Sequence, residues 1–159
     1  SLSGVPVREA MLTDFKVLSP DDTLGDAAGW LLAGSQRDFP VVERGQVVGV
    51  LVHADLFRAL GEHGETATVG AVMRRDLETV DASELLDAAL TQVRVEKGLT
   101  LPVTQHGQLV GLLTAENVGE LFMIRTALAG RPRSSPPPLP ASPAPPLLAS
   151  PVIVPKPAH

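Results

Sequence analysis

The segment Phe39–Leu51, FPVVERGQVVGVL, recurs 62 positions later as Leu101–Leu113, LPVTQHGQLVGLL. Each copy is an apolar run with proline in second place, then a glycine-containing turn and a second apolar run. Glycine supplies the positive φ that a tight hairpin turn needs, and proline is tolerated near the start of a strand. The sequence therefore predicts the same β-hairpin twice, with turns at Arg44-Gly45 and His106-Gly107.

The repeat extends well beyond the hairpin, because Val7–Leu60 aligns with Val69–Phe122 without a gap. In each copy, a short helical lead-in and a short extended segment precede a helix, the hairpin and a second helix. The expected elements are Val7–Met11, Phe15–Leu18, a helix from Leu24 and one over about Ala54–Leu60, with counterparts at Val69–Met73, Leu77–Val80, a helix from Leu86 and one over Ala115–Ala129. Two such units are expected to bury their apolar faces against each other. The predicted fold is an α/β domain of two β-α-β-β-α repeats, residues 1–64 and 65–130, related by pseudo-twofold symmetry.

The helix that follows Thr23 has a recognisable start and an apolar stripe. Thr23, with Asp26 three positions later, has the pattern of a capping box. The stripe has helical spacing and comprises Leu24, Ala27, Ala28, Leu31 and Leu32. The residues expected in the core of the two repeats are Leu24, Ala27, Leu31, Val41, Val48, Leu86, Ala89, Val93, Val103 and Val110.

Charged residues are distributed unevenly along the 159-residue chain. All 18 acidic residues precede Gly130, together with 10 of the 13 basic ones, so the repeat region is strongly acidic. A nucleic-acid-binding domain normally has a basic face, which argues against nucleic acid as a partner. No apolar run reaches the roughly 18 residues that span a bilayer, so we expect no membrane span in this chain.

Residues 131–159 differ sharply in composition from the repeats. Eleven of the 15 prolines lie here, mixed with serine and alanine. Such a segment cannot bury enough apolar surface to order itself and favours polyproline II. We expect a disordered tail. PxxP spacings such as Pro140–Pro143 leave open a role as a ligand for a proline-binding domain, and a solvated linker is the simpler interpretation.

The sequence contains no recognisable catalytic constellation. It has no cysteine, which excludes disulfides and thiol chemistry. Histidine occurs at His53, His63, His106 and His159, and no two of these are spaced as metal ligands on a helix. There is neither a Walker-type phosphate loop nor a nucleophile elbow. We therefore expect that this chain is not itself an enzyme and holds no metal.

The junction of the last strand and the second helix carries the most specific signal in each copy. It reads GVLVHAD over Gly49–Asp55 and GLLTAEN over Gly111–Asn117. Together with the methionine near the start of each copy and the proline that opens the middle strand, these segments resemble the cystathionine-β-synthase-type domain, the CBS domain. The resemblance covers about Val7 to Leu128 and implies a tandem CBS pair, which is an α/β regulatory module.

The resemblance also implies two clefts between the repeats that bind AMP, ATP or another adenosyl ligand. A carboxylate at the start of the second helix would accept hydrogen bonds from the ribose hydroxyls. A Thr or Ser hydroxyl three residues earlier, with the N–H groups of the first helical turn, would suit phosphate. Backbone just before the strand-opening proline of the partner repeat would read the adenine edge.

Carried over to this sequence, the first site departs from the family pattern. It keeps Asp55 for the ribose but has Val52 in the hydroxyl position, and His53 is a further candidate for phosphate. The segment that includes Leu99 and Thr100 would face it from the other repeat. Helix capping alone would also explain an aspartate at this position.

The second site departs in a different way. It keeps Thr114 but has Asn117 in place of the acid, and it would face the segment Gln36-Arg37-Asp38. Asparagine binds hydroxyls more weakly than a carboxylate does, and the neighbouring Glu116 would oppose a phosphate. We therefore expect the cleft at Asp55 to be the better of the two sites.

The last predicted helix, Ala115–Ala129, is apolar on more than one side. The stripe expected to face the core comprises Val118, Leu121 and Phe122. The apolar residues off that stripe are Met123, Ile124 and Ala127. A helix that is apolar around most of its circumference is usually buried on both sides. We expect a homodimer partner or an adjoining domain to cover the second side.

Three stretches, Ala10–Phe15, Ala33–Val41 and Glu116–Arg125, resemble the CBS pair appended to site-2-protease-type intramembrane zinc metalloproteases of bacteria. The resemblance implies a parent chain whose zinc-binding HExxH helix and membrane spans precede this segment. This chain would then be the cytoplasmic, membrane-tethered regulatory part of such a protease, and would sense an adenine nucleotide. A dimerisation module whose clefts bind no nucleotide is the alternative.

Overall fold

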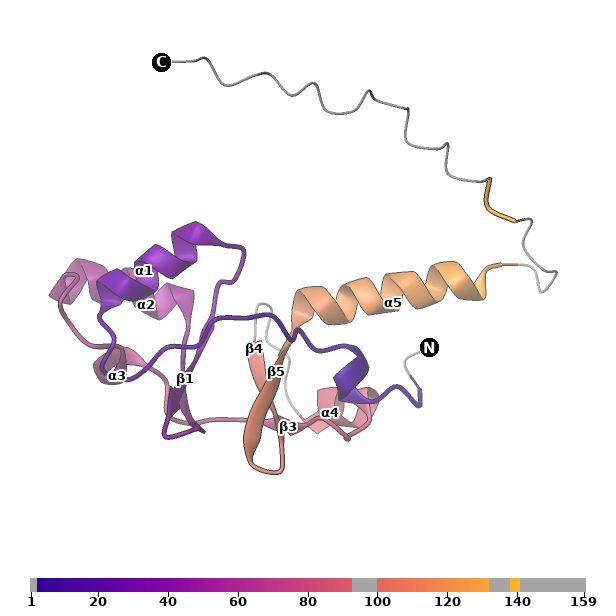
Figure 1. The fold of residues 1–159 in the computed structure, drawn as a ribbon, viewed down its shortest axis with the longest axis horizontal. Helices are drawn as coiled ribbons and strands as arrows, with labels where there is room; N and C mark the ends of the chain where they lie inside the picture. The colour runs from indigo at the N-terminus through magenta and orange to yellow at the C-terminus, as the bar shows by residue number, and fades with distance from the viewer. Residues whose placement is uncertain (1–2, 93–99, 132–137, 141–159) are drawn as a thin grey trace, which may run out of the picture. The chain divides into compact units, whose positions relative to one another are not determined.

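The computed structural model describes residues 3–92, 100–131 and 138–140. Ser1–Ala129 form one compact unit and Gly130–His159 a second, and most of the predicted tail lies outside the described residues. The elements of the first unit are, in chain order, η1 (Val7–Glu9), α1 (Leu24–Ala33), β1 (Phe39–Glu43), β2 (Gln46–Leu51), α2 (His53–His63), α3 (Val69–Val72), β3 (Val80–Asp81), α4 (Leu86–Gln92), β4 (Thr100–Gln105), β5 (Gln108–Thr114) and α5 (Ala115–Ala129). Helices α1, α2 and α3 accompany the β1–β2 hairpin, and α4 and α5 accompany the strands β3, β4 and β5 (Figure 1).

Both predicted hairpins are present, with matching turns. The strands of each hairpin pair in antiparallel fashion, β1 with β2 and β4 with β5. Arg44 and Gly45 have φ of 51° and 76°, and His106 and Gly107 have φ of 51° and 77°. Two successive residues with positive φ match the right-handed twist of the flanking strands. The predicted turns are therefore confirmed in both copies.

A parallel pairing completes each half of the fold. In the second half, β3 lies parallel to β4, with Val80 opposite Val103. In the first half, Leu18 forms a single parallel bridge to Val41. Leu18 and Val80 are 62 positions apart, as are Val41 and Val103, and we call such pairs repeat equivalents. The structure confirms the predicted α/β fold of two β-α-β-β-α repeats.

Helix α1 begins as its sequence predicts. The hydroxyl of Thr23 accepts a hydrogen bond from the backbone N–H of Asp26, and the carboxylate of Asp26 accepts one from the N–H of Thr23, both at 3.1 Å. Along the helix, Leu24 and Ala27 are buried and Leu31 packs against the same core. Leu32, however, is 87% exposed, so its assignment to the apolar stripe was wrong. It lies about 80° around the helix from Leu24, on the side away from Ala27.

Each hydrophobic core draws on both repeats. The core around the first hairpin comprises Leu18, Leu24, Ala27, Phe39, Val41, Leu51, Leu56, Ala59, Val69 and Met73. The core around the second comprises Val5, Val7, Ala10, Val80, Ala82, Leu86, Ala89, Leu101, Val103 and Leu113. Val69 and Met73 come from the lead-in of the second repeat, whereas Val5, Val7 and Ala10 come from that of the first. The repeats thus exchange their lead-in segments, which ties the two halves together.

Two glycines make this exchange sterically feasible. A Cβ atom on Gly49 would lie 2.6 Å from the sulfur of Met73, and one on Gly111 would lie 2.5 Å from the sulfur of Met11. Both distances are too short for a real contact, so each lead-in methionine packs where only glycine leaves room. Because Gly49 and Gly111 are repeat equivalents, the same constraint acts in both halves.

Most residues expected in the core are buried or pack against it. Fully buried are Leu24, Ala27, Val41, Leu86, Ala89 and Val103, while Leu31, Val48 and Val110 are partly buried against the two cores. Val93 lies outside the described residues. On α5, Val118 and Leu121 pack against the second core as predicted. Phe122 is 49% exposed, so its place in the inward stripe was wrong; it follows Leu121 by one residue, or about 100° around the helix.

Candidate functional site

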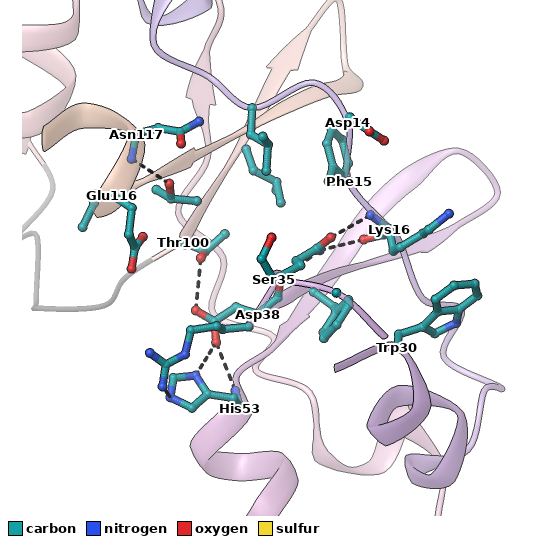
Figure 2. A pocket seen from close by; sticks show the side chains of 18 of the residues that line it. Asp14, Phe15, Lys16, Trp30, Ser35, Asp38, His53, Thr100, Glu116 and Asn117 are labelled. Atoms are coloured by element: carbon teal, nitrogen blue, oxygen red, sulfur yellow. Dashed lines mark hydrogen bonds and ion pairs between the residues drawn. The ribbon is translucent and has the colours of Figure 1, made fainter. Parts of the chain in front are cut away.

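A cavity of about 1130 Å³ opens in the first unit, where elements of the two repeats meet. Its walls come from segments far apart in the sequence (Figure 2). They are the segment Asp14–Lys16, the end of α1 with the loop to Asp38, His53 at the start of α2, Thr100 at the start of β4, and the first residues of α5. Of the predicted site residues, the cavity brings together Arg37, Asp38, His53, Thr100, Thr114 and Asn117.

Asp38 is the organising residue of the junction between the repeats. Its side chain is only 4% exposed and accepts three hydrogen bonds. The donors are the backbone N–H of His53 at 3.0 Å, Nδ1 of His53 at 2.9 Å and the hydroxyl of Thr100 at 3.0 Å (Figure 2). Thr100 is the repeat equivalent of Asp38, so this bond joins matching positions of the two copies. A buried carboxylate with three donors is well satisfied.

The pairing also fixes the tautomer of His53. A guanidinium group can only donate, so Nε2 of His53 accepts from Arg37 across 3.2 Å. Nδ1 therefore carries the hydrogen that is donated to Asp38. The rings of His53 and Phe57 form a T-shaped contact, with their centroids 6.3 Å apart. His53 is thereby held from three sides, and Arg37 lies at the cavity wall.

The start of α5 contributes the second wall. The hydroxyl oxygen of Thr114 accepts from the backbone N–H of Asn117 at 3.1 Å, which caps the helix. The hydroxyl hydrogen of Thr114 is left to donate to another group. Glu116 and Glu120 also line the cavity and are exposed. The wall therefore combines one hydroxyl and one amide with two carboxylates.

Lys16, Gln36 and Trp30 form a third wall. The side-chain amide of Gln36 pairs with the backbone of Lys16, accepting from its N–H at 2.8 Å and donating to its C=O at 2.9 Å. The ammonium group of Lys16 lies 4.9 Å from the ring centre of Trp30, a cation–π contact. The sequence prediction missed Lys16 and Trp30 at this site. The single tryptophan of the chain is 43% exposed, and an aromatic residue off the apolar stripe was the available signal.

Asp55 lies apart from these walls. Its carboxylate accepts from Nε of Arg74 at 2.8 Å and from Arg58 at 3.4 Å, and it is absent from the lining of the cavity. Val52 precedes α2 and provides no side-chain cap. Leu99, expected opposite these residues, lies outside the described residues. Thr100, the other residue expected opposite Asp55, instead donates to Asp38 at the described cavity.

Among residues 3–92, 100–131 and 138–140, no three His, Asp or Glu side chains are grouped so as to hold a metal ion. No helix in the same ranges has the length and apolar character that a membrane crossing needs.

Comparison with known proteins defines the family. The sequence pattern of the CBS domain matches residues 7–62 and again residues 69–122. The chain therefore belongs to the CBS-domain family and contains a tandem CBS pair, as its two junction segments predict.

Individual relatives agree with this assignment. The CBS domain-containing protein YhcV of Bacillus subtilis is 28% identical over 110 residues, which are 67% of this chain and 78% of YhcV. The crystal structure of CBSX2 in complex with AMP is 25% identical, with a TM-score of 0.67 over 77% of this chain and 99% of CBSX2. The CBS domain of a CBS domain-containing membrane protein from Sphaerobacter thermophilus is also 25% identical, with a TM-score of 0.62 over 74% of this chain and 87% of that domain.

Proposed function

We propose that this CBS pair is a regulatory module that binds an adenosyl ligand, AMP or ATP in the first instance, in the described cavity. The observation that carries the proposal is the cavity itself, which places Thr114 and Asn117 of one repeat opposite the segment Gln36-Arg37-Asp38 of the other. The structure of CBSX2, which is similar to this chain, contains AMP. That similarity supports an adenine nucleotide as the ligand class.

The polar groups of the cavity have separate roles in this proposal. Asn117 donates to and accepts from the ribose hydroxyls. Thr114 donates its hydroxyl hydrogen to a phosphate oxygen, and Arg37 and Lys16 supply positive charge across the cavity. Glu116 opposes a phosphate and limits how many phosphate groups the site accepts. We propose a second, related site at Asp55, with Val52 and Leu99 beside it.

Calorimetric titration of the full chain with AMP, ADP, ATP and S-adenosylmethionine tests the proposal. We expect at least one of these ligands to bind. We also expect Thr114→Val to weaken the binding of AMP more than the binding of adenosine. Thr114→Ser keeps both the hydroxyl and the helix cap and is the matched control. No binding at millimolar concentrations of any of the four compounds would contradict the proposal.

Specific contacts favour an alternative in which the clefts bind nothing. Arg74 already occupies the carboxylate of Asp55, and Gln36 already satisfies the backbone of Lys16. Under this alternative the chain is a dimerisation module. The same titrations separate the two functions, because only the regulatory module gives a heat of binding that depends on Thr114.

We also propose that the module forms a homodimer through α5. None of the residues of α5 is buried in the chain itself, and the exposed fractions of Met123 and Ile124 are 71% and 57%. Such a surface is normally covered by a partner. Sedimentation is expected to show a dimer for the wild type and a monomer for Met123→Glu. If the wild type stays monomeric at high concentration, the homodimer is contradicted, and we would propose that a parent domain covers the surface instead.

The parent that we propose is a site-2-protease-type zinc metalloprotease, with this module on the cytoplasmic side of the membrane. The support is the resemblance of Ala10–Phe15, Ala33–Val41 and Glu116–Arg125, and the similarity to the CBS domain of a membrane protein from Sphaerobacter thermophilus. Sequencing the gene around this segment tests the proposal. An upstream reading frame without an HExxH helix and membrane spans would contradict it.

A further inference from the structure

The side chain of Gln36 makes three hydrogen bonds at the cavity wall. Its oxygen accepts from the N–H of Lys16 at 2.8 Å, and its nitrogen donates to the C=O of Lys16 at 2.9 Å and to the C=O of Asp38 at 3.0 Å. The bonds at Lys16 are drawn as dashed lines in Figure 2. Because a backbone N–H can only donate, the oxygen of the amide must face Lys16, and the orientation of the amide is fixed.

This pattern of donors and acceptors is the one that adenine presents at its edge. The amide of Gln36 has an amino group that donates two hydrogen bonds, next to a single acceptor oxygen. Adenine has the same arrangement, with its N6 amino group next to a ring nitrogen that accepts. Guanine differs, because it has a carbonyl oxygen where adenine has the amino group. The backbone of Lys16 and the carbonyl of Asp38 therefore form a complementary surface for adenine, which Gln36 occupies.

Aromatic side chains stand beside the same backbone. Phe15 and Trp30 both line the cavity, and Trp30 is 43% exposed. An aromatic wall next to a hydrogen-bonding edge suits a planar heterocycle, since the ring face and the ring edge are then both contacted. The position of Gln36 is thus a place for a flat, adenine-like group rather than for a phosphate.

We propose that Gln36 is an internal stand-in for adenine, and that an adenosyl ligand binds this cavity by displacing the Gln36 amide from Lys16 and Asp38. The inference rests on the proposed function and adds that Gln36 sets the affinity of the cavity for the adenosyl ligand. Its repeat equivalent is Gly98, which has no side chain, so only one of the two copies carries such a competitor.

The competition has a measurable consequence. A ligand that must displace an intramolecular contact binds with its affinity reduced by the fraction of molecules in which that contact is open. Removing the side chain leaves the backbone of Lys16 in contact with water, which a ligand displaces more easily. We expect Gln36→Ala to bind adenosine about tenfold more tightly, equivalent to about 1.4 kcal/mol.

The experiment is a calorimetric titration of the full chain with adenosine, which carries no phosphate and so reports on the base and the ribose. The variants are Gln36→Ala, Gln36→Glu and the exposed control Gln46→Ala. Glutamate still accepts from Lys16 but cannot donate to the two carbonyls, so Gln36→Glu is expected to bind more tightly as well. Gln46→Ala is expected to bind adenosine with the affinity of the wild type. Gln36→Ala is expected to leave the affinity for guanosine unchanged.

An NMR titration of the wild type tests the displacement without any substitution. Adenosine is expected to shift the side-chain NH₂ signals of Gln36 towards those of a solvated amide, while the backbone N–H of Lys16 stays hydrogen bonded. If adenosine binds but Gln36→Ala binds it equally or more weakly, the inference is overturned while the proposed function stands. If neither adenosine nor AMP binds the wild type or Gln36→Ala, both fail.

Discussion

Asp55 and Asn117 are repeat equivalents at the starts of α2 and α5, yet their surroundings differ. The carboxylate of Asp55 accepts from Arg74 at 2.8 Å, whereas Asn117 lines the described cavity. The repeat equivalent of Arg74 is Leu12, which lines that cavity and carries no charge. The exchange between arginine and leucine therefore places a cation beside Asp55 and an apolar side chain at the cavity that Asn117 lines.

The N-termini of the same two helices differ as well. Helix α5 is capped by its own Thr114, whereas α2 is preceded by Val52 and receives its cap from Asp38, whose carboxylate accepts from the N–H of His53. A helix N-terminus attracts anions, so at α2 this place is already taken by a carboxylate. The comparison shows that the hydroxyl missing at Val52 is compensated from outside the helix.

The largest effect is expected from Asp38→Ala, which disrupts the junction at α2 and leaves the cap of α5 in place. Asp38→Ala leaves three partly buried donors, on His53 and Thr100, without their acceptor, and we expect it to lower the free energy of unfolding by about 2–4 kcal/mol. Thr114→Val removes the corresponding cap at α5 and is expected to cost about 1 kcal/mol. Urea unfolding measures both. Equal losses at the two junctions would contradict the asymmetric account of the caps.

The second prediction tests the symmetric part of the scaffold. Gly49→Ala and Gly111→Ala each place a Cβ against a lead-in methionine and against backbone carbonyl oxygens, at 2.9 Å for Arg74 and 3.1 Å for Leu12. We expect both to lower the free energy of unfolding by about 1–3 kcal/mol. Gly29→Ala, where the new Cβ meets nothing within 4 Å, is the control. A large difference between the two halves would show that the exchange of lead-ins is not equivalent.

The third prediction ranks the two clefts. The sequence alone ranks the cleft at Asp55 higher, so that Asp55→Ala would lose about tenfold in nucleotide affinity and Asn117→Ala little. The described cavity, in which we propose that Asn117 binds the ribose, predicts the larger loss for Asn117→Ala. Arg74 sharpens this test, since ribose hydroxyls must compete with it for Asp55. Arg74→Leu introduces the residue type found at the repeat equivalent, Leu12, and is expected to tighten nucleotide binding at Asp55. A larger loss for Asp55→Ala than for Asn117→Ala would support the ranking from the sequence and contradict the assignment of the ligand to the described cavity.

The sequence could predict what depends on local pattern. The hairpin turns, the capping box at Thr23 and the bounds of α5 all follow from residues close together in the chain. The contacts between Asp55 and Arg74, and between Lys16 and Gln36, join residues 19 and 20 positions apart, and no local pattern indicates them. The exchange of lead-in segments could likewise not be predicted from the sequence, because an ungapped repeat does not indicate which copy each lead-in packs against.

The smallest predicted effect concerns the turn before α4. The Ser83 hydroxyl and, less strongly, its backbone N–H donate to Asp81 and lower the pKa of that carboxyl below its usual 3.8. Ser83→Ala is expected to raise the pKa of Asp81 towards 3.8, which an NMR titration of the carboxyl carbon measures. Since the folded-state pKa is lowered, these bonds stabilise the fold above the unfolded pKa and lose their effect as the pH falls through the folded pKa. An unchanged pKa in Ser83→Ala would exclude the hydroxyl as the main cause.

The most direct test of the central claim is an NMR titration of the ¹⁵N-labelled full chain with AMP. If the described cavity is the ligand site, the largest amide shifts will occur at Lys16, at Asp38 and over Thr114–Asn117, because these line it. Amides at the far ends of the hairpins, such as Gly45 and Gly107, will shift little. Shifts confined to the surroundings of Asp55, or no shifts at saturating AMP, would contradict the account.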